Sequence, residues 1–96
     1  MDILNESASE VPLLLQQLRE GKRVVGVKQL RKALQEGRAR RVFLAKNADP
    51  RLTEPMELLC GQREVPCTWV ATMADLGNAC GIDVGAAAAA VVSDCD

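Results

Sequence analysis

The stretch GAAAAAVV at residues 85–92 decides the fold. Residues 86–92 are all small and apolar, so an extended strand here would present no polar side chain on either face. Such a strand belongs in the interior of a sheet, packed tightly under helices on both sides. The run is far shorter than a membrane-spanning helix, which needs about 20 apolar residues.

The segments before this strand alternate between expected helices and strands. Strands are expected at residues 23–25, 41–45, 65–70 and 86–92, and helices at 12–20, 27–36, 53–62 and from 73 or 75 to 80. Residues 47–50 read as a turn, Thr53 as the N-cap of the third helix, and Glu54 and Glu57 as its first-turn acids. The alternation predicts an α/β fold, a three-layer α-β-α sandwich around a small mixed sheet of about four strands.

The 96 residues are enough for one domain, which we place at residues 11–93 after a flexible acidic N-terminus at 1–10. None of the four cysteines forms a CxxC pair, and the chain has no histidine, so we expect no metal site and no cofactor. The cysteines then serve as small buried thiols in a cytoplasmic protein without a membrane segment. We expect a monomer.

Charge is distributed unevenly along the chain. Residues 19–46 hold ten basic and two acidic residues, a net charge of +8, whereas residues 1–18 carry −3 and residues 47–96 carry −6. This asymmetry suggests one basic face and one acidic face, and the basic face would suit a polyanion. Charge alone leaves nucleic-acid binding and an ordinary solvated surface equally open.

Catalysis has little support in the sequence. The commonest acid–base residue, histidine, is missing, and no nucleophile elbow or Walker loop occurs. Gly77, Gly81 and Gly85 recur at intervals of four, which is not a dinucleotide-binding pattern. We read them as a turn, a helix end and a close contact, and we expect no enzyme.

The segment from Gly26 to Lys32 carries the most information about function. Gly26 lets the backbone approach a ligand, and the helix start that follows attracts phosphate. Lys28 and Lys32 are four residues apart and share a face, with Gln29 beside them. Lysine and glutamine can both read base edges. Because the major groove of regular A-form RNA is deep and narrow, such a helix would need RNA opened by a bend or by non-canonical pairs.

Three motifs now resemble a known family: GVKQLRK (26–32), AKNADP (45–50) and LGNACGIDVGAA (76–87). In this order and spacing they are similar to the kink-turn-binding family typified by the archaeal ribosomal protein L7Ae, and most similar to its small bacterial branch. The resemblance covers residues 12–92. It implies an α/β/α sandwich without enzyme activity that binds kink-turn RNA, in ribosomal RNA, a riboswitch or another non-coding RNA, and possible residence on the ribosome.

The resemblance also implies a set of contact residues. Archaeal and eukaryotic members read tandem sheared G·A pairs with Gly-x-Asn-Glu-x-x-Lys; here Gly26 and Lys32 match, while Lys28 replaces Asn and Gln29 replaces Glu. Asn78 stands where lysine is common, which removes one phosphate contact. For Met73 two roles stay open, a surface for extruded nucleotides and a core or helix-start position. The expected RNA-binding residues are Gly26, Lys28, Gln29, Arg31, Lys32, Lys46, Ala71, Thr72 and Met73.

A different class of function remains an alternative. The acidic second half, the altered pair at 28 and 29, and Asn78 would also suit a protein-interaction or scaffolding module on the same fold that has lost specific RNA binding.

Overall fold

The computed structural model describes residues 16, 18, 19 and 21–93. The expected acidic segment 1–10 and most of the expected helix 12–20 lie outside the described residues. In the described part the elements follow in the order β1 (Arg23–Val25), α2 (Val27–Gln35), β2 (Ala39–Ala45), α3 (Pro50–Arg63), β3 (Cys67–Val70), α4 (Met73–Ala79) and β4 (Ala88–Val92).

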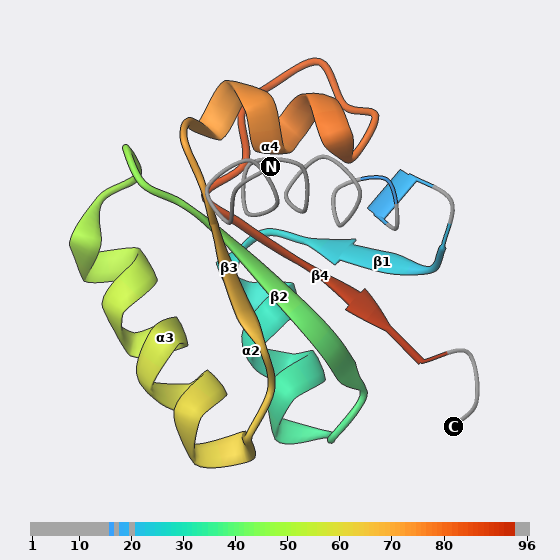
Figure 1. Ribbon diagram of the computed structural model, residues 1–96, viewed down its shortest axis with the longest axis vertical. Helices are drawn as coiled ribbons and strands as arrows, with labels where there is room; N and C mark the ends of the chain where they lie inside the picture. Colours follow the sequence, from blue (N-terminus) through green and yellow to red (C-terminus); the bar gives the residue numbers. More distant parts are fainter. Residues whose placement is uncertain (1–15, 17, 20, 94–96) are drawn as a thin grey trace, which may run out of the picture.

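The four strands form one mixed sheet in the order β1-β4-β2-β3 (Figure 1). β4 is antiparallel to both of its neighbours, and β2 is parallel to β3. The alanine-rich strand therefore lies inside the sheet, as predicted. Ala88, Ala89 and Ala90 have no exposed surface.

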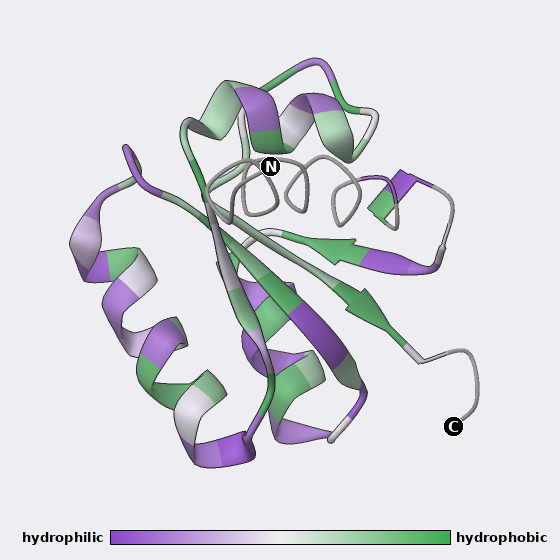
Figure 2. Cartoon of the chain, viewed as in Figure 1, coloured by the Kyte–Doolittle hydropathy of each residue, from purple (hydrophilic) through white to green (hydrophobic). Residues whose placement is uncertain are grey.

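Two hydrophobic clusters, one on each face of the sheet, confirm the three-layer sandwich. On one face, Leu30 and Leu34 of α2 and Met56 of α3 pack against Val42 and Leu44. On the other face, Leu18, Leu76 and Cys80 pack against Phe43 and Ala45. Because side chains alternate along β2, its carboxyl half contributes to both cores. Figure 2 shows β4 and the later parts of β1 and β2 as hydrophobic and shows hydrophilic stretches along α2 and α3.

The predicted start of α3 was wrong. The helix begins at Pro50, and the side chain of Asp49 caps it by accepting the N–H of Arg51 at 2.9 Å. Asp followed by Pro is a strong N-cap and first-turn pair, which the expected turn at 47–50 concealed. Thr53, the expected cap, is 3% exposed inside the helix, and no acidic residue lies in the first turn.

The strand bounds also shift. β2 begins at Ala39, two residues before the prediction, with an irregular register between Ala39 and Arg41. β3 begins at Cys67, two residues after its predicted start at residue 65. The N–H of Val65 donates to the Cys60 carbonyl at the end of α3 rather than to a strand. β4 begins at Ala88 rather than at residue 86.

The cysteines are free thiols in the described part of the chain. Cys60 and Cys80 are buried, and Cys67 is half-buried. A hydrogen bond between the thiols of Cys60 and Cys67 raises the pKa of Cys60 and lowers that of Cys67. Burial raises the pKa of Cys80. Cys95 lies outside the described residues.

Gly77, which was expected in a turn, lies inside α4 where the helix packs closely against the loop before β4. A Cβ atom added there would run into the carbonyl oxygen of Val84, whereas a Cβ on Gly61 in α3 would meet no atom within 4 Å. Gly81 has a φ of 78° and follows the C-cap of α4, so it is the expected helix end.

Gly77→Ala is expected to destabilise the fold by roughly 1–3 kcal/mol, because the added methyl group forces α4 away from the loop. Gly61→Ala is the matched control. It should raise stability by about 0.4–1 kcal/mol, since alanine in an open helical position reduces the entropy of the unfolded chain. Urea unfolding curves measure both changes. Equal shifts for the two variants would contradict the close contact at Gly77.

Candidate nucleic-acid interface

Three strands finish at the same end of the sheet, where β4 begins. We call this end, at which the chain leaves β1, β2 and β3, the Gly26 edge. β1, β2 and β3 all run in one direction, since β4 is antiparallel to β1 and β2 and β2 is parallel to β3. The N–H of Gly26, directly after β1, donates to the Ala88 carbonyl at 2.8 Å. The N–H of Ala45, at the end of β2, donates to the Ala87 carbonyl at 3.0 Å. The segments that follow the three strands therefore meet at this edge (Figure 1).

The turn after β2 is joined to the start of α4. The N–H of Lys46 donates to the Val70 carbonyl at 2.8 Å, and the Asn47 Oδ1 accepts the N–H of Met73 at 2.8 Å. The Met73 carbonyl accepts the N–H of Ala86 at 3.0 Å. The sequence indicated only a turn at Asn47, because its partner is 26 residues away.

Gly26 gives α2 an open N-terminus. Its φ of 102° is a conformation that side-chain-bearing residues rarely adopt, and a Cβ atom there would meet nothing within 4 Å. The first bond within the helix runs from the N–H of Leu30 to the Gly26 carbonyl, and no side chain caps α2. The N–H groups of residues 27–29 therefore have no partner within the helix and lie at the positive end of the helix dipole.

The outer face of α2 is basic. Lys28, Gln29, Arg31 and Lys32 are all exposed, as expected, while Leu30, Ala33 and Leu34 face the core. Lys28 and Gln29 stand at the open helix start, and Arg31 and Lys32 follow one turn later. Lys46 is also exposed and lies beside this start, at the same edge of the sheet.

The loop at residues 71–73 has a strong structural role. The Thr72 hydroxyl caps α4 by accepting the N–H of Asp75 at 3.0 Å. Met73 is the first residue of α4, and its half-buried side chain packs against the core under this helix. Of the two roles left open for Met73, the helix-start and core role is therefore present in the structure. Ala71 is exposed beside the end of β3.

The cations of residues 19–46 do not form one face, contrary to the expectation. α2 leads away from the Gly26 edge and β2 returns to it, so the segment spans the sheet twice. Arg40 lies at the beginning of β2, roughly 20 Å along the strand from Lys46 at about 3.3 Å per residue. Arg40 is therefore remote from the helix start.

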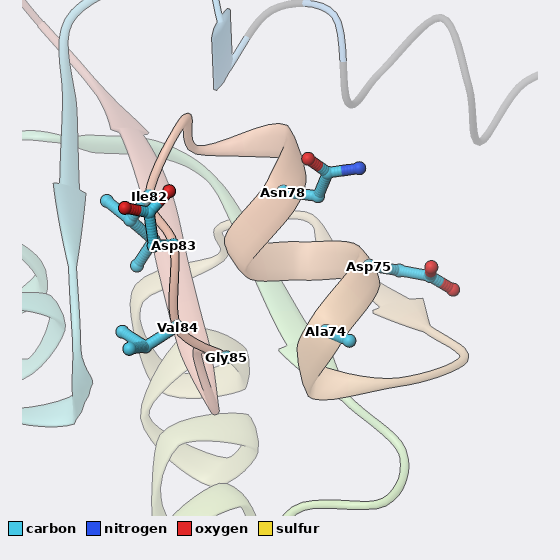
Figure 3. Close-up of a pocket in the computed structure, with 7 residues that line it drawn as sticks. All are labelled: Ala74, Asp75, Asn78, Ile82, Asp83, Val84 and Gly85. Carbon is cyan, nitrogen blue, oxygen red and sulfur yellow. The ribbon is translucent and has the colours of Figure 1, made fainter.

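A surface hollow of about 390 Å³ lies between α4 and the loop before β4 (Figure 3). Asp75, Asn78 and Asp83 line it together with four apolar residues or glycine. Figure 3 shows Asp75 and Asn78 projecting from α4 away from the loop that carries Asp83. Two carboxylates make this surface unfavourable for phosphate, and Asn78 adds no charge to offset them.

The start of α3 carries a close ion pair next to the edge. The Arg51 Nη2 lies 2.8 Å from the Asp49 Oδ2, and the hydrogen bonds from Arg51 lower the pKa of this carboxyl. Because Arg51 already pairs with Asp49, it is less available to a ligand than Lys46. Lys46 has no carboxylate partner within the described residues.

Comparison with known proteins places the chain in a family. The family model for the ribosomal protein L7Ae/L30e/S12e/Gadd45 family matches residues 11–96. The chain belongs to this family. The motifs at 26–32, 45–50 and 76–87 lie within the matched region, so the resemblance found in the sequence is confirmed.

Curated relatives in the family are bacterial proteins. An RNA-binding protein of Geobacillus sp. (strain WCH70) is 45% identical over 75 residues, which cover 78% of this chain and 92% of that protein. RNA-binding protein YbxF of Geobacillus stearothermophilus is 44% identical over the same shares. An RNA-binding protein of Halalkalibacterium halodurans is 43% identical over 71% of this chain and 83% of its own length.

Solved structures share the fold. The Giardia lamblia 15.5kD RNA binding protein superposes with a TM-score of 0.81 at 26% identity, over 90% of this chain and 77% of its own. A protein of unknown function from Bacillus halodurans superposes with a TM-score of 0.74 at 24% identity, over 83% of this chain and 84% of its own, which supports the fold alone.

None of the helices in the described part is long and apolar enough to span a membrane.

Asn47→Ala is expected to loosen the start of α4, because the N–H of Met73 loses its acceptor. The expected cost is about 1 kcal/mol, and hydrogen exchange at the Met73 amide should accelerate. Asn47→Asp keeps the acceptor oxygen and should retain protection at this amide. Lys46→Ala is the neighbouring control, with a change within about 0.5 kcal/mol. Unchanged exchange in Asn47→Ala would show that this bond does not hold the two segments together.

Proposed function

We propose that the chain binds RNA through the edge where β1, β2 and β3 end, and that its target is a kink-turn. The observation that carries the proposal is the convergence of three segments: the open start of α2, the Lys46 turn and the loop at 71–73. Relatives that match this chain over most of their own length are named RNA-binding proteins, and these names support RNA as the ligand.

The helix start supplies two kinds of contact. The free N–H groups of residues 27–29 and the ammonium groups of Lys28 and Lys32 attract phosphate, which gives affinity without sequence information. Gln29 can both donate to and accept from a base edge, and Lys28 can donate to guanine O6 and N7. Both kinds of contact occur on one exposed turn, so the helix can hold a phosphate and read the adjacent base.

The geometry favours bent RNA over a regular duplex. A helix start read in this way must enter a groove, and the major groove of A-form RNA is too narrow and deep to admit it. A kink-turn opens that groove and exposes sheared G·A pairs, which is the ligand that the family resemblance implies. Because Lys28 and Gln29 replace an amide and a carboxylate of the archaeal motif, base preference is expected to differ in detail.

Lys28→Ala and Gln29→Ala are each expected to weaken binding to a kink-turn RNA by roughly 1–3 kcal/mol if they read bases. Gln35→Ala, on the last turn of the same helix and also exposed, is the matched control and should bind like the parent chain. Fluorescence titration at fixed salt measures the affinities. The competitor RNA has both G·A pairs replaced by Watson–Crick pairs.

Equal affinity for the two RNAs would exclude specific kink-turn recognition. In that case the interaction-module alternative can be tested by capture of partners from a lysate with and without RNase. Partners that persist after RNase treatment would favour the alternative.

A further inference from the structure

The end of the sheet opposite the candidate interface holds a second group of cations. β1 and β2 begin there and β4 ends there, and Arg23 and Arg41 are register partners of Val91 from its two sides. Neighbouring strands lie about 4.8 Å apart, so the two arginine Cα atoms are roughly 10 Å apart. Lys22 and Arg40 flank them in sequence. We call these four residues the distal basic cluster.

Arg23 and Arg41 lie on one face of the sheet. Val25 and Phe43, two residues further along each strand, belong to the core beneath α4, and side chains two apart share a face. Val91 belongs to the same face and is only partly buried. Beyond this core the face continues as a partly open surface. Figure 2 shows hydrophilic stretches near the beginnings of β1 and β2, with hydrophobic β4 between them.

The charge of the distal basic cluster is not neutralised by the described part of the chain. No described carboxylate lies within 4 Å of a basic group in the cluster; nearby, Glu36 pairs with Arg38 at 3.4 Å. The Arg23 Nη1 donates to the Leu18 carbonyl at 3.2 Å, which is an uncharged acceptor. Like charges gathered on β1 and β2, the two strands that flank β4, repel one another, and a bound polyanion would relieve this repulsion.

The side chains of the cluster favour duplex RNA over single-stranded RNA as the polyanion. Single-stranded RNA is usually held by aromatic side chains that stack on bases. The chain has only two aromatic residues: Phe43 is fully buried, and Trp69 packs on the opposite face of the sheet. The cluster also has no amide side chain to read base edges. Cations alone suit the backbone of a duplex.

We propose that the distal basic cluster binds the phosphate backbone of a duplex stem that extends from the kinked motif. Arg41 and Ala45 are four residue steps apart along β2, a span of roughly 13 Å, so one RNA can reach both the helix start and the cluster. This contact is independent of sequence. This inference rests on the proposed function in one respect: it places both contacts on the same kink-turn RNA.

The test compares three kink-turn RNAs, one with minimal stems and two in which one stem or the other is lengthened by about ten base pairs. One of the lengthened RNAs should bind the parent chain several-fold more tightly than the minimal RNA, and Arg40→Gln/Arg41→Gln should lose that gain. If two phosphate contacts are lost, the slope of log K against log salt should fall by about 1.8, at 0.9 per contact as for duplex DNA. Arg63→Gln removes one exposed charge from α3 on the opposite face and should keep the gain.

Either of two results would overturn the proposal: neither lengthened RNA binds the parent chain more tightly than the minimal RNA, or the double variant keeps both the gain and the salt slope. If the double variant fails to fold in urea titration, Arg40→Gln alone and the charge-preserving Arg41→Lys replace it, and the former should lose part of the gain while the latter keeps it. A lengthened RNA without G·A pairs separates the two proposals. Loss of its weak binding in the double variant supports the cluster even if kink-turn preference is absent.

Discussion

Three consecutive alanines at the entry to β4 hold the candidate interface together. The carbonyls of Ala87 and Ala88 accept the N–H groups of Ala45 and Gly26, and the N–H of Ala86 donates to the start of α4. All of these are backbone bonds, and one side-chain bond, from the N–H of Met73 to the Asn47 Oδ1, adds to them. None of the exposed lysines and arginines of the interface takes part in fixing the helix start, the Lys46 turn and the 71–73 loop. The surface residues can then differ between family members while the frame stays the same.

The alanines at 88–90, the next part of the same run, set how closely the layers pack. Alanine is a poor strand former by intrinsic preference, so its presence at 88–90 needs another cause. These residues have no exposed surface, with α2 on one face and α4 on the other. Small side chains let both helices approach the sheet. Gly77 extends this close packing to the loop before β4, where no room for a methyl group is left.

Local patterns predicted the elements but not the contacts between them. The strand at 86–92, the helix after Gly26 and the short helix after Thr72 follow from apolar spacing and glycine, which act within a few residues. The start of α3 was missed because Asp49 and Thr53 are both good N-cap types; the Asp49-Pro50 pair favoured the earlier start, and the capping bond of Asp49 and the burial of Thr53 confirm it. The hydrogen bond that the N–H of Met73 donates to the Asn47 Oδ1 joins the segments after β2 and β3, which are 26 residues apart, so no local pattern contains it. The family resemblance, not spacing, brought the 71–73 loop into the site.

The path of the chain turns one basic segment into two surfaces with different properties. α2 and β2 run in opposite directions, so Lys28 and Gln29 reach one end of the sheet and Arg41 the other. Hydrogen bonds to base edges depend on sequence, whereas contacts to phosphate depend on salt. Asp75 and Asp83, two acidic residues of the second half of the chain, would repel phosphate from the hollow beside α4. Repulsion of this kind would favour docking at the basic surfaces, because it disfavours the competing ways to dock.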